Sequence, residues 1–131
     1  MKKEVILVVL LFIGLASAGI LNAVSEASQA AINYILTKPQ NAWTTMAKAA
    51  ASQSNISSDH LLNISGNNAN DYSSAILAIT AINQGPRVFG PSDYVAKLES
   101  FWDGTQLGDQ GLLNDDIFGL LALISAGEPA L

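Results

Sequence analysis

A chain of 131 residues has room for one domain, and with 50% hydrophobic and 13% charged side chains it can bury a sizeable core. It contains no cysteine, so disulfides and a thiol nucleophile are excluded. The net charge of −5 argues against nucleic acid as a partner, because phosphates require a basic surface.

The first eighteen residues have the pattern of a secretory signal peptide. A short positively charged stub precedes an almost unbroken apolar run from Val5 to Leu15, and Ala16-Ser17-Ala18 supplies the small residues that a signal peptidase recognises. The alternative is an uncleaved membrane anchor over residues 5–21, which is close to the shortest length that spans a bilayer. We expect cleavage of residues 1–18, which leaves four basic and ten acidic side chains and a charge of −6. The protein is then secreted or at the cell surface, and membrane-anchored if residues 5–21 are retained.

The first half of the remaining chain predicts helices. Apolar residues form one face of 20–37, and an Ala-rich helix is expected over 42–52. A polar stretch follows, in which a short helix is expected over 58–64. The segment 71–83 is apolar nearly all round and ends at Gly85-Pro86.

The second half repeats this order. Ser92 is expected to cap an amphipathic helix over 92–103, and Asn114 to cap another fully apolar helix over 115–126. A helix without a polar face is normally enclosed by its neighbours. The pattern therefore predicts three helix pairs in two layers, with the apolar helices inside.

Two of these segments are related by an internal repeat at an offset of 44 residues. Asn70-Asp71 corresponds to Asn114-Asp115, and the apolar run 76–79 corresponds to 120–123. Both copies stop just before a Gly and a Pro. Repeats of this length are typical of arrays of helix pairs.

Residues 114–128 resemble an inner helix of the α/α toroid repeat, and residues 71–82 resemble the same element one repeat earlier. This repeat is shared by terpene cyclases, protein prenyltransferase β-subunits and cobalamin carriers. The chain is most similar to exported archaeal proteins, of the methanogen type and without an assigned role, that carry the toroid. The resemblance implies an all-α fold in which residues 19–131 form a partial toroid domain. Three helix pairs, of about six in a full ring, would make about half a toroid.

The catalytic motifs that this resemblance implies are incomplete. Cyclases use an Asp-x-Asp-Asp motif, but Leu113-Asn114-Asp115-Asp116 lacks its first Asp. The zinc site of prenyltransferases needs a Cys, which the chain lacks, and a His, of which it has one, His60. We expect His60 to face solvent at the start of a helix and Asp115 to act as a first-turn acid. No catalytic residue, metal site or cofactor is predicted.

Five residues remain as candidates for binding or modification. The aromatic residues Trp43, Tyr72 and Phe118 fall on the expected inner helices and could line a pocket for an apolar ligand, although ordinary core packing is the alternative. Asn55 and Asn63 each begin a glycosylation sequon in the polar stretch.

The leading hypothesis is an exported, non-enzymatic binding or cell-surface module whose ligand is unknown. One alternative is a terpene cyclase-like enzyme, or half of one, whose acids come from a missing segment. Another is a truncated fragment without a function of its own. Because an open end of a helix array exposes core residues, we also expect self-association or pairing with a second half-toroid.

Overall fold

A computed structural model describes residues 25–128. The expected signal peptide, 1–18, and the alternative membrane anchor, 5–21, both lie outside this range. The chain divides into two compact units, Met1–Thr37 and Lys38–Leu131. Residues 25–36 of the first unit are α-helical, as the sequence predicts for this part of 20–37.

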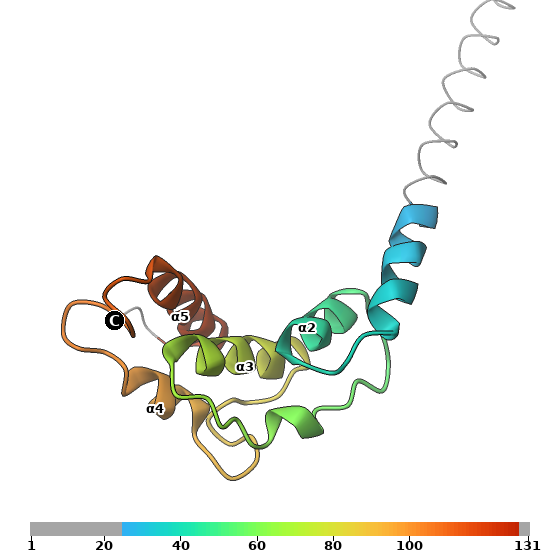
Figure 1. The fold of residues 1–131 in the computed structure, drawn as a ribbon. Helices are drawn as coiled ribbons and strands as arrows, with labels where there is room; N and C mark the ends of the chain where they lie inside the picture. The colour runs from blue at the N-terminus through green and yellow to red at the C-terminus, as the bar shows by residue number, and fades with distance from the viewer. Residues whose placement is uncertain (1–24, 129–131) are drawn as a thin grey trace, which may run out of the picture. The chain divides into compact units, whose positions relative to one another are not determined.

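The second unit is built from helices (Figure 1). In chain order they are α2 (Ala42–Ala50), the 3₁₀ turn η1 (Asp59–Leu61), α3 (Ala69–Ala81), α4 (Tyr94–Glu99) and α5 (Leu113–Ser125). Within 25–128 there is no β-strand, and extended pairing is limited to one isolated bridge between Trp102 and Leu107. The all-α class is therefore confirmed. Each helix expected beyond residue 40 has a counterpart, although those at 58–64 and 92–103 are shorter than expected.

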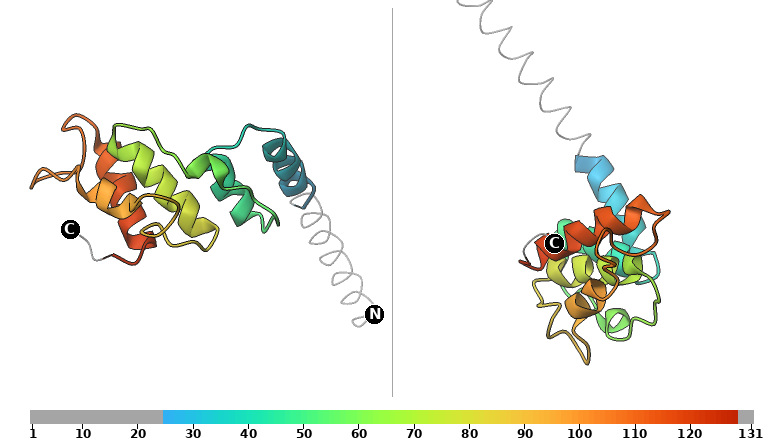
Figure 2. Two further views of the ribbon diagram at one scale, coloured as in Figure 1. Left: turned by 90° about the horizontal axis from the view of Figure 1, so that it is seen from below. Right: turned by 90° about the vertical axis from the view of Figure 1, so that its left-hand side faces the viewer.

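Three helices, α2, α3 and α5, lie side by side (Figures 1 and 2). The Asn70 side chain near the start of α3 donates to Asp115 near the start of α5, and Thr80 near the end of α3 donates to Ser125 at the end of α5. Because the starts of the two helices contact each other, and so do their ends, α3 and α5 run parallel. A parallel neighbour requires a returning segment, and α4, which packs against α3, lies in that return.

The segment between α2 and α3 and the segment between α3 and α5 also contact each other. The Tyr94 hydroxyl of α4 donates to the Leu61 carbonyl of η1 at 2.6 Å, and both residues are buried. The hydrogen bond satisfies the one polar group of a large buried aromatic side chain.

The backbone geometry of α3 recurs in α5 at the same offset of 44 residues. Both helices have 13 residues, and both are followed at the second position by a residue with positive φ, Asn83 at 58° and Gly127 at 82°. The 6→1 bond of a Schellman motif closes each end at 3.0 Å, from Gln84 to Ile79 and from Glu128 to Leu123. The helix α2 ends in the same way, with Ser52 at φ 53°.

The helix α2 begins at Ala42 as expected, but α4 and α5 begin at other residues than the sequence suggests. Asp93, not Ser92, caps α4, because its carboxylate accepts the Ala96 N–H at 2.9 Å. The N-cap of α5 is Leu112, and the expected cap Asn114 lies inside the helix because the Asp115 N–H already bonds to the Leu112 carbonyl. The expected first-turn acid Asp115 is confirmed.

The core lies between α3 and α4. Ile76 and Ile79 of α3 and Val95 and Leu98 of α4 are fully buried. Enclosure of the apolar helix 71–83 is thus largely confirmed.

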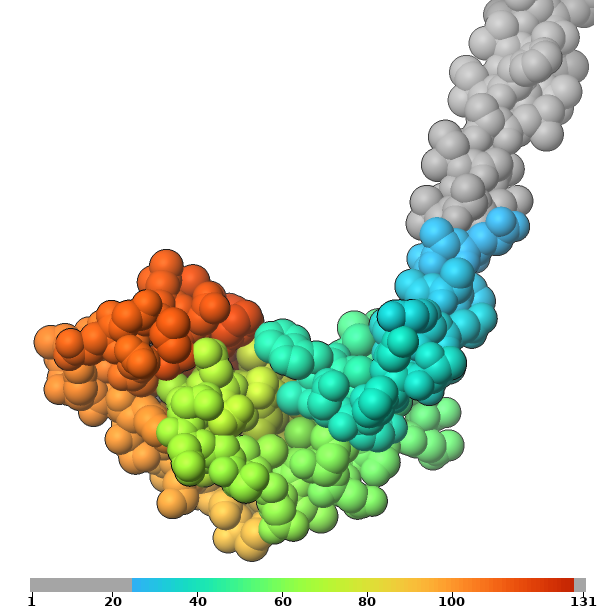
Figure 3. All heavy atoms as spheres, in the orientation of Figure 1, coloured from blue at the N-terminus to red at the C-terminus, as the bar shows by residue number. Residues whose placement is uncertain are grey.

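For 115–126 the expectation of enclosure is wrong. Gly119, Ala122 and Leu123 of α5 are buried, but five large side chains are 45–71% exposed: Leu113, Ile117, Leu120, Leu121 and Ile124. The helix packs extensively against α3 alone, so its other side is left open. In Figure 3 the atoms of α5, in orange-red, form an edge of the second unit.

Candidate ligand site

The N-terminal ends of α2 and α3 border a hollow of about 450 Å³. Its position depends on how α2 begins. The Asn41 side chain accepts the Thr44 N–H and the Thr44 hydroxyl accepts the Asn41 N–H, both at 2.9 Å, which is a reciprocal capping box. The cap fixes the second helical residue, Trp43, at the wall of the hollow, where it stays 55% exposed.

The lining of this hollow mixes apolar and polar groups. Trp43, Leu61 and Ile64 form apolar walls, while His60, Asn63, Asp71 and other polar side chains stand among them. Both the size and the mixture are those of small-molecule sites. Of the expected candidates, Trp43 and Asn63 therefore lie at the same hollow.

Phe118 of α5 reaches Trp43 from the other side. The two rings meet edge to face, with centroids 5.4 Å apart and planes at 75°. This is a favoured aromatic geometry, and it stiffens an otherwise exposed indole. Two of the three aromatic candidates are thus brought together.

Tyr72 belongs to a different aromatic group. Its ring lies 5.8 Å from Phe101 and 6.3 Å from Tyr94, which connects α3 to α4 and the turn that follows it. The structure therefore places Tyr72 in the packing between α3 and α4, apart from the hollow beside Trp43.

His60 does not face solvent as expected. It is half-buried, and its Nε2 lies 3.0 Å from the hydroxyl of Thr45, which is fully buried. A hydroxyl beside an imidazole is the arrangement of a nucleophile and its base. Because Thr45 is inaccessible, however, this pair can orient the His60 ring but cannot attack a substrate.

The acidic pair of α5 is engaged by the loop before the helix and by α3. Asp115, which is buried, accepts from the Asn70 amide at 2.5 Å and from the Asp109 N–H at 2.9 Å. Asp116 accepts the Leu107 N–H at 2.8 Å. Both carboxylates thus hold the 104–112 loop in place.

A larger hollow, of about 650 Å³, lies at the C-terminal ends of α2 and α3. Its lining is mainly polar and includes Asn55, Asn83 and Gln84, so an apolar ligand would gain less there than beside Trp43. Asn55 and Asn63 are both exposed, and so both sequons are accessible to a modifying enzyme.

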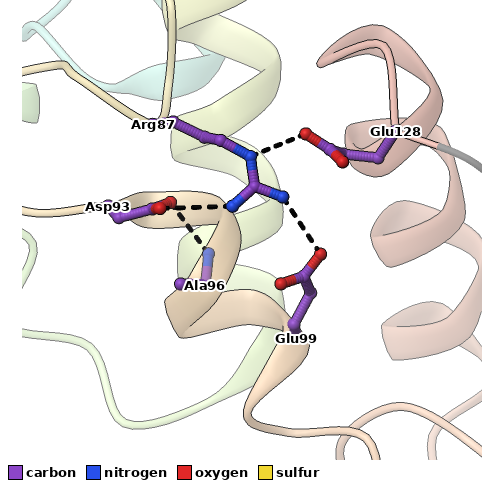
Figure 4. Close-up of polar contacts among 5 residues, drawn as sticks. All are labelled: Arg87, Asp93, Ala96, Glu99 and Glu128. Carbon is purple, nitrogen blue, oxygen red and sulfur yellow. Dashed lines mark hydrogen bonds and ion pairs between the residues drawn. The ribbon is translucent and has the colours of Figure 1, made fainter.

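The Arg87 guanidinium, in the loop between α3 and α4, forms ion pairs with three carboxylates (Figure 4). Arg87 reaches Glu128 at 2.7 Å, Asp93 at 3.2 Å and Glu99 at 3.3 Å, which ties the end of α5 to both ends of α4. The hydrogen bond from Arg87 lowers the pKa of Glu128. Desolvation opposes a lowered pKa at Asp93, but the hydrogen bonds from Ala96 and Arg87 outweigh it and lower the pKa there too.

Within residues 25–128, no three His, Asp or Glu side chains gather as a potential metal site. No helix of this range is long and apolar enough to cross a membrane.

No known protein family, curated protein or solved structure matches the chain.

Proposed function

We propose that this chain is an exported, non-enzymatic binding module with a prenyltransferase- and squalene-cyclase-like helical repeat fold, which holds an apolar or partly apolar small molecule against Trp43. The observation that carries the proposal is the exposed indole of Trp43, fixed by the Asn41 cap and by the Phe118 ring at the wall of a 450 Å³ hollow. A rigid, solvent-facing aromatic ring offers apolar area at little entropic cost.

The surroundings of Trp43 support a ligand with a polar end. Ile64, beside Trp43, would contact its apolar part; at the rim the Asn63 amide could donate or accept a hydrogen bond and the Asp71 carboxylate could accept one. An isoprenoid alcohol combines these two properties.

The toroid-type architecture is part of the proposal. It is supported by the parallel course of α3 and α5, by their common offset of 44 residues, and by the shared C-terminal geometry of α2, α3 and α5. These features are expected of inner helices that repeat around an axis.

The chain has two tryptophans, which allows a direct test. The exported protein carrying Trp102→Phe reports on Trp43 alone, and Trp43→Phe reports on Trp102 alone. We expect farnesol to change the emission of Trp43 saturably and to leave that of Trp102 unchanged. Equal responses in the two variants, or no saturable response from Trp43, would refute binding at this hollow.

A further inference from the structure

The exposed side chains of α5 follow a regular spacing. Leu113, Ile117, Leu120 and Ile124 are separated by four, three and four residues, which is the d-a-d-a order of a heptad repeat. All four are 45–71% exposed, and Leu121, at 48%, lies beside them. We call these five residues the α5 seam.

The composition of the seam is that of a two-helix contact. Isoleucine occupies both a positions and leucine both d positions, the combination that favours two strands among parallel coiled coils. The seam carries neither a charge nor a hydrogen-bonding side chain, so its complement must be an apolar helix face. The same seam on a second copy meets this requirement.

The internal repeat supports a helix as the occupant. Asn70 and Thr80 mark the stripe of α3 that faces α5, since both hydrogen-bond to it. At an offset of 44 residues, Thr80 corresponds to Ile124, and Leu77 and Ser73 of the same stripe correspond to Leu121 and Ile117. Three of the five seam residues, Ile117, Leu121 and Ile124, therefore lie on the stripe of α5 that corresponds to the stripe of α3 against which a parallel helix packs.

At these equivalent positions a polar side chain is buried in α3 and an apolar one is exposed in α5, the reverse of what is usual. Ser73 is fully covered and yet polar, whereas its counterpart Ile117 is 45% exposed and aliphatic. Contiguous exposed apolar side chains are unusual on a monomer and mark interaction sites.

We propose that this protein forms a homodimer in which the α5 seams of two copies pair in parallel about a two-fold axis. Phe118, which faces Trp43, lies outside the contact, so dimerisation and ligand binding use different sides of α5.

Oligomeric state tests the proposal. The exported protein is examined by size-exclusion chromatography with light scattering over a range of concentrations. We expect a dimer whose dissociation constant rises by about 100-fold or more in Ile117→Glu and Leu120→Glu, because each would set like charges against each other in an apolar contact. Val88→Glu is the control, since Val88 is 84% exposed and belongs to the loop between α3 and α4, not to α5. A monomeric wild-type protein, or equal effects of all three substitutions, would overturn the proposal.

A second measurement covers the case in which the glutamate variants misfold. Because the chain has no cysteine, Ile117→Cys introduces a single thiol at an a position. Parallel pairing brings the two thiols together, so oxidation should give a covalent dimer, whereas Val88→Cys should stay largely monomeric. Failure of Ile117→Cys to cross-link, or its protection from a maleimide in a monomer, would show that something other than a second seam covers α5. Neither result affects the Trp43 emission test.

Discussion

The buried Asp115 carboxylate joins α5 both to α3 and to the loop before α5, and its removal should be costly. In Asp115→Ala, the Asn70 amide loses its acceptor on α5 and the Asp109 N–H loses the bond that fixes the 104–112 loop. The carboxylate is almost fully buried. Water can therefore replace it only after the loop moves.

The magnitude follows from the two hydrogen bonds. Bonds to a charged partner contribute roughly 1.5–3 kcal/mol each, and part of this loss is offset because no carboxylate has to be desolvated in the variant. We expect a net loss of about 3 kcal/mol from a total stability of about 5–15 kcal/mol. In a domain of this size that lowers Tm by roughly 12–24 °C.

Thermal unfolding followed by circular dichroism measures this loss. The matched control is Asp71→Ala, which changes the equivalent residue of the preceding repeat, where the side chain is half-buried. We expect at most about 1 kcal/mol there. A Tm for Asp115→Ala within a few degrees of that control would contradict the role of the buried carboxylate.

Substitutions at Arg87 and at two glycines, Gly108 and Gly104, test other parts of the unit. Arg87 lowers the pKa of both Asp93 and Glu128. These carboxylates therefore stabilise the fold at a pH above their pKa values in the unfolded chain, near 3.8 and 4.5. That stabilisation is lost as the pH falls through their lower pKa values in the folded protein. Arg87→Ala should therefore lower Tm at neutral pH, and the difference from wild type should shrink below about pH 4; a difference independent of pH would argue against the ion pairs. Gly108→Ala and Gly104→Ala both place a side chain at positive φ, which costs roughly 1–2 kcal/mol, but only at 108 would the new Cβ also overlap the carboxylate of Asp115. Gly108→Ala should be the more destabilising by about 1–3 kcal/mol in denaturant unfolding, and equal losses would exclude the overlap.

Periodicity and helix-stop signals predicted the helices well where both were present. The segments 71–83 and 115–126 end in the structure within two residues of the prediction, because their C-terminal motifs are local and readable. The helix 92–103 was overestimated. Phe101 and Trp102 continue its apolar spacing, but the Phe101 carbonyl accepts the Gly108 N–H and Trp102 bridges to Leu107. A contact with a later loop thus ends the helix at Glu99.

The candidate site was less predictable, because it depends on pairs of residues far apart in sequence. Aromatic composition and helix placement selected Trp43, Tyr72 and Phe118 alike. Only the positions of α2 and α5 beside α3 separate the Trp43–Phe118 pair from Tyr72, which packs towards α4. The ion pairs of Arg87 and the Thr45–His60 contact leave no local signal either.

The apolar character of α5 has a different origin from that of α3. A helix has 3.6 residues per turn, so Ile117 and Phe118 point about 100° apart. One side of α5 packs against α3, with Phe118 turned towards Trp43, and a second carries Gly119, which lets Leu107 approach closely. The seam takes up a third side. A helix that is apolar all round can thus serve three separate apolar contacts, and enclosure within one chain does not follow from its composition.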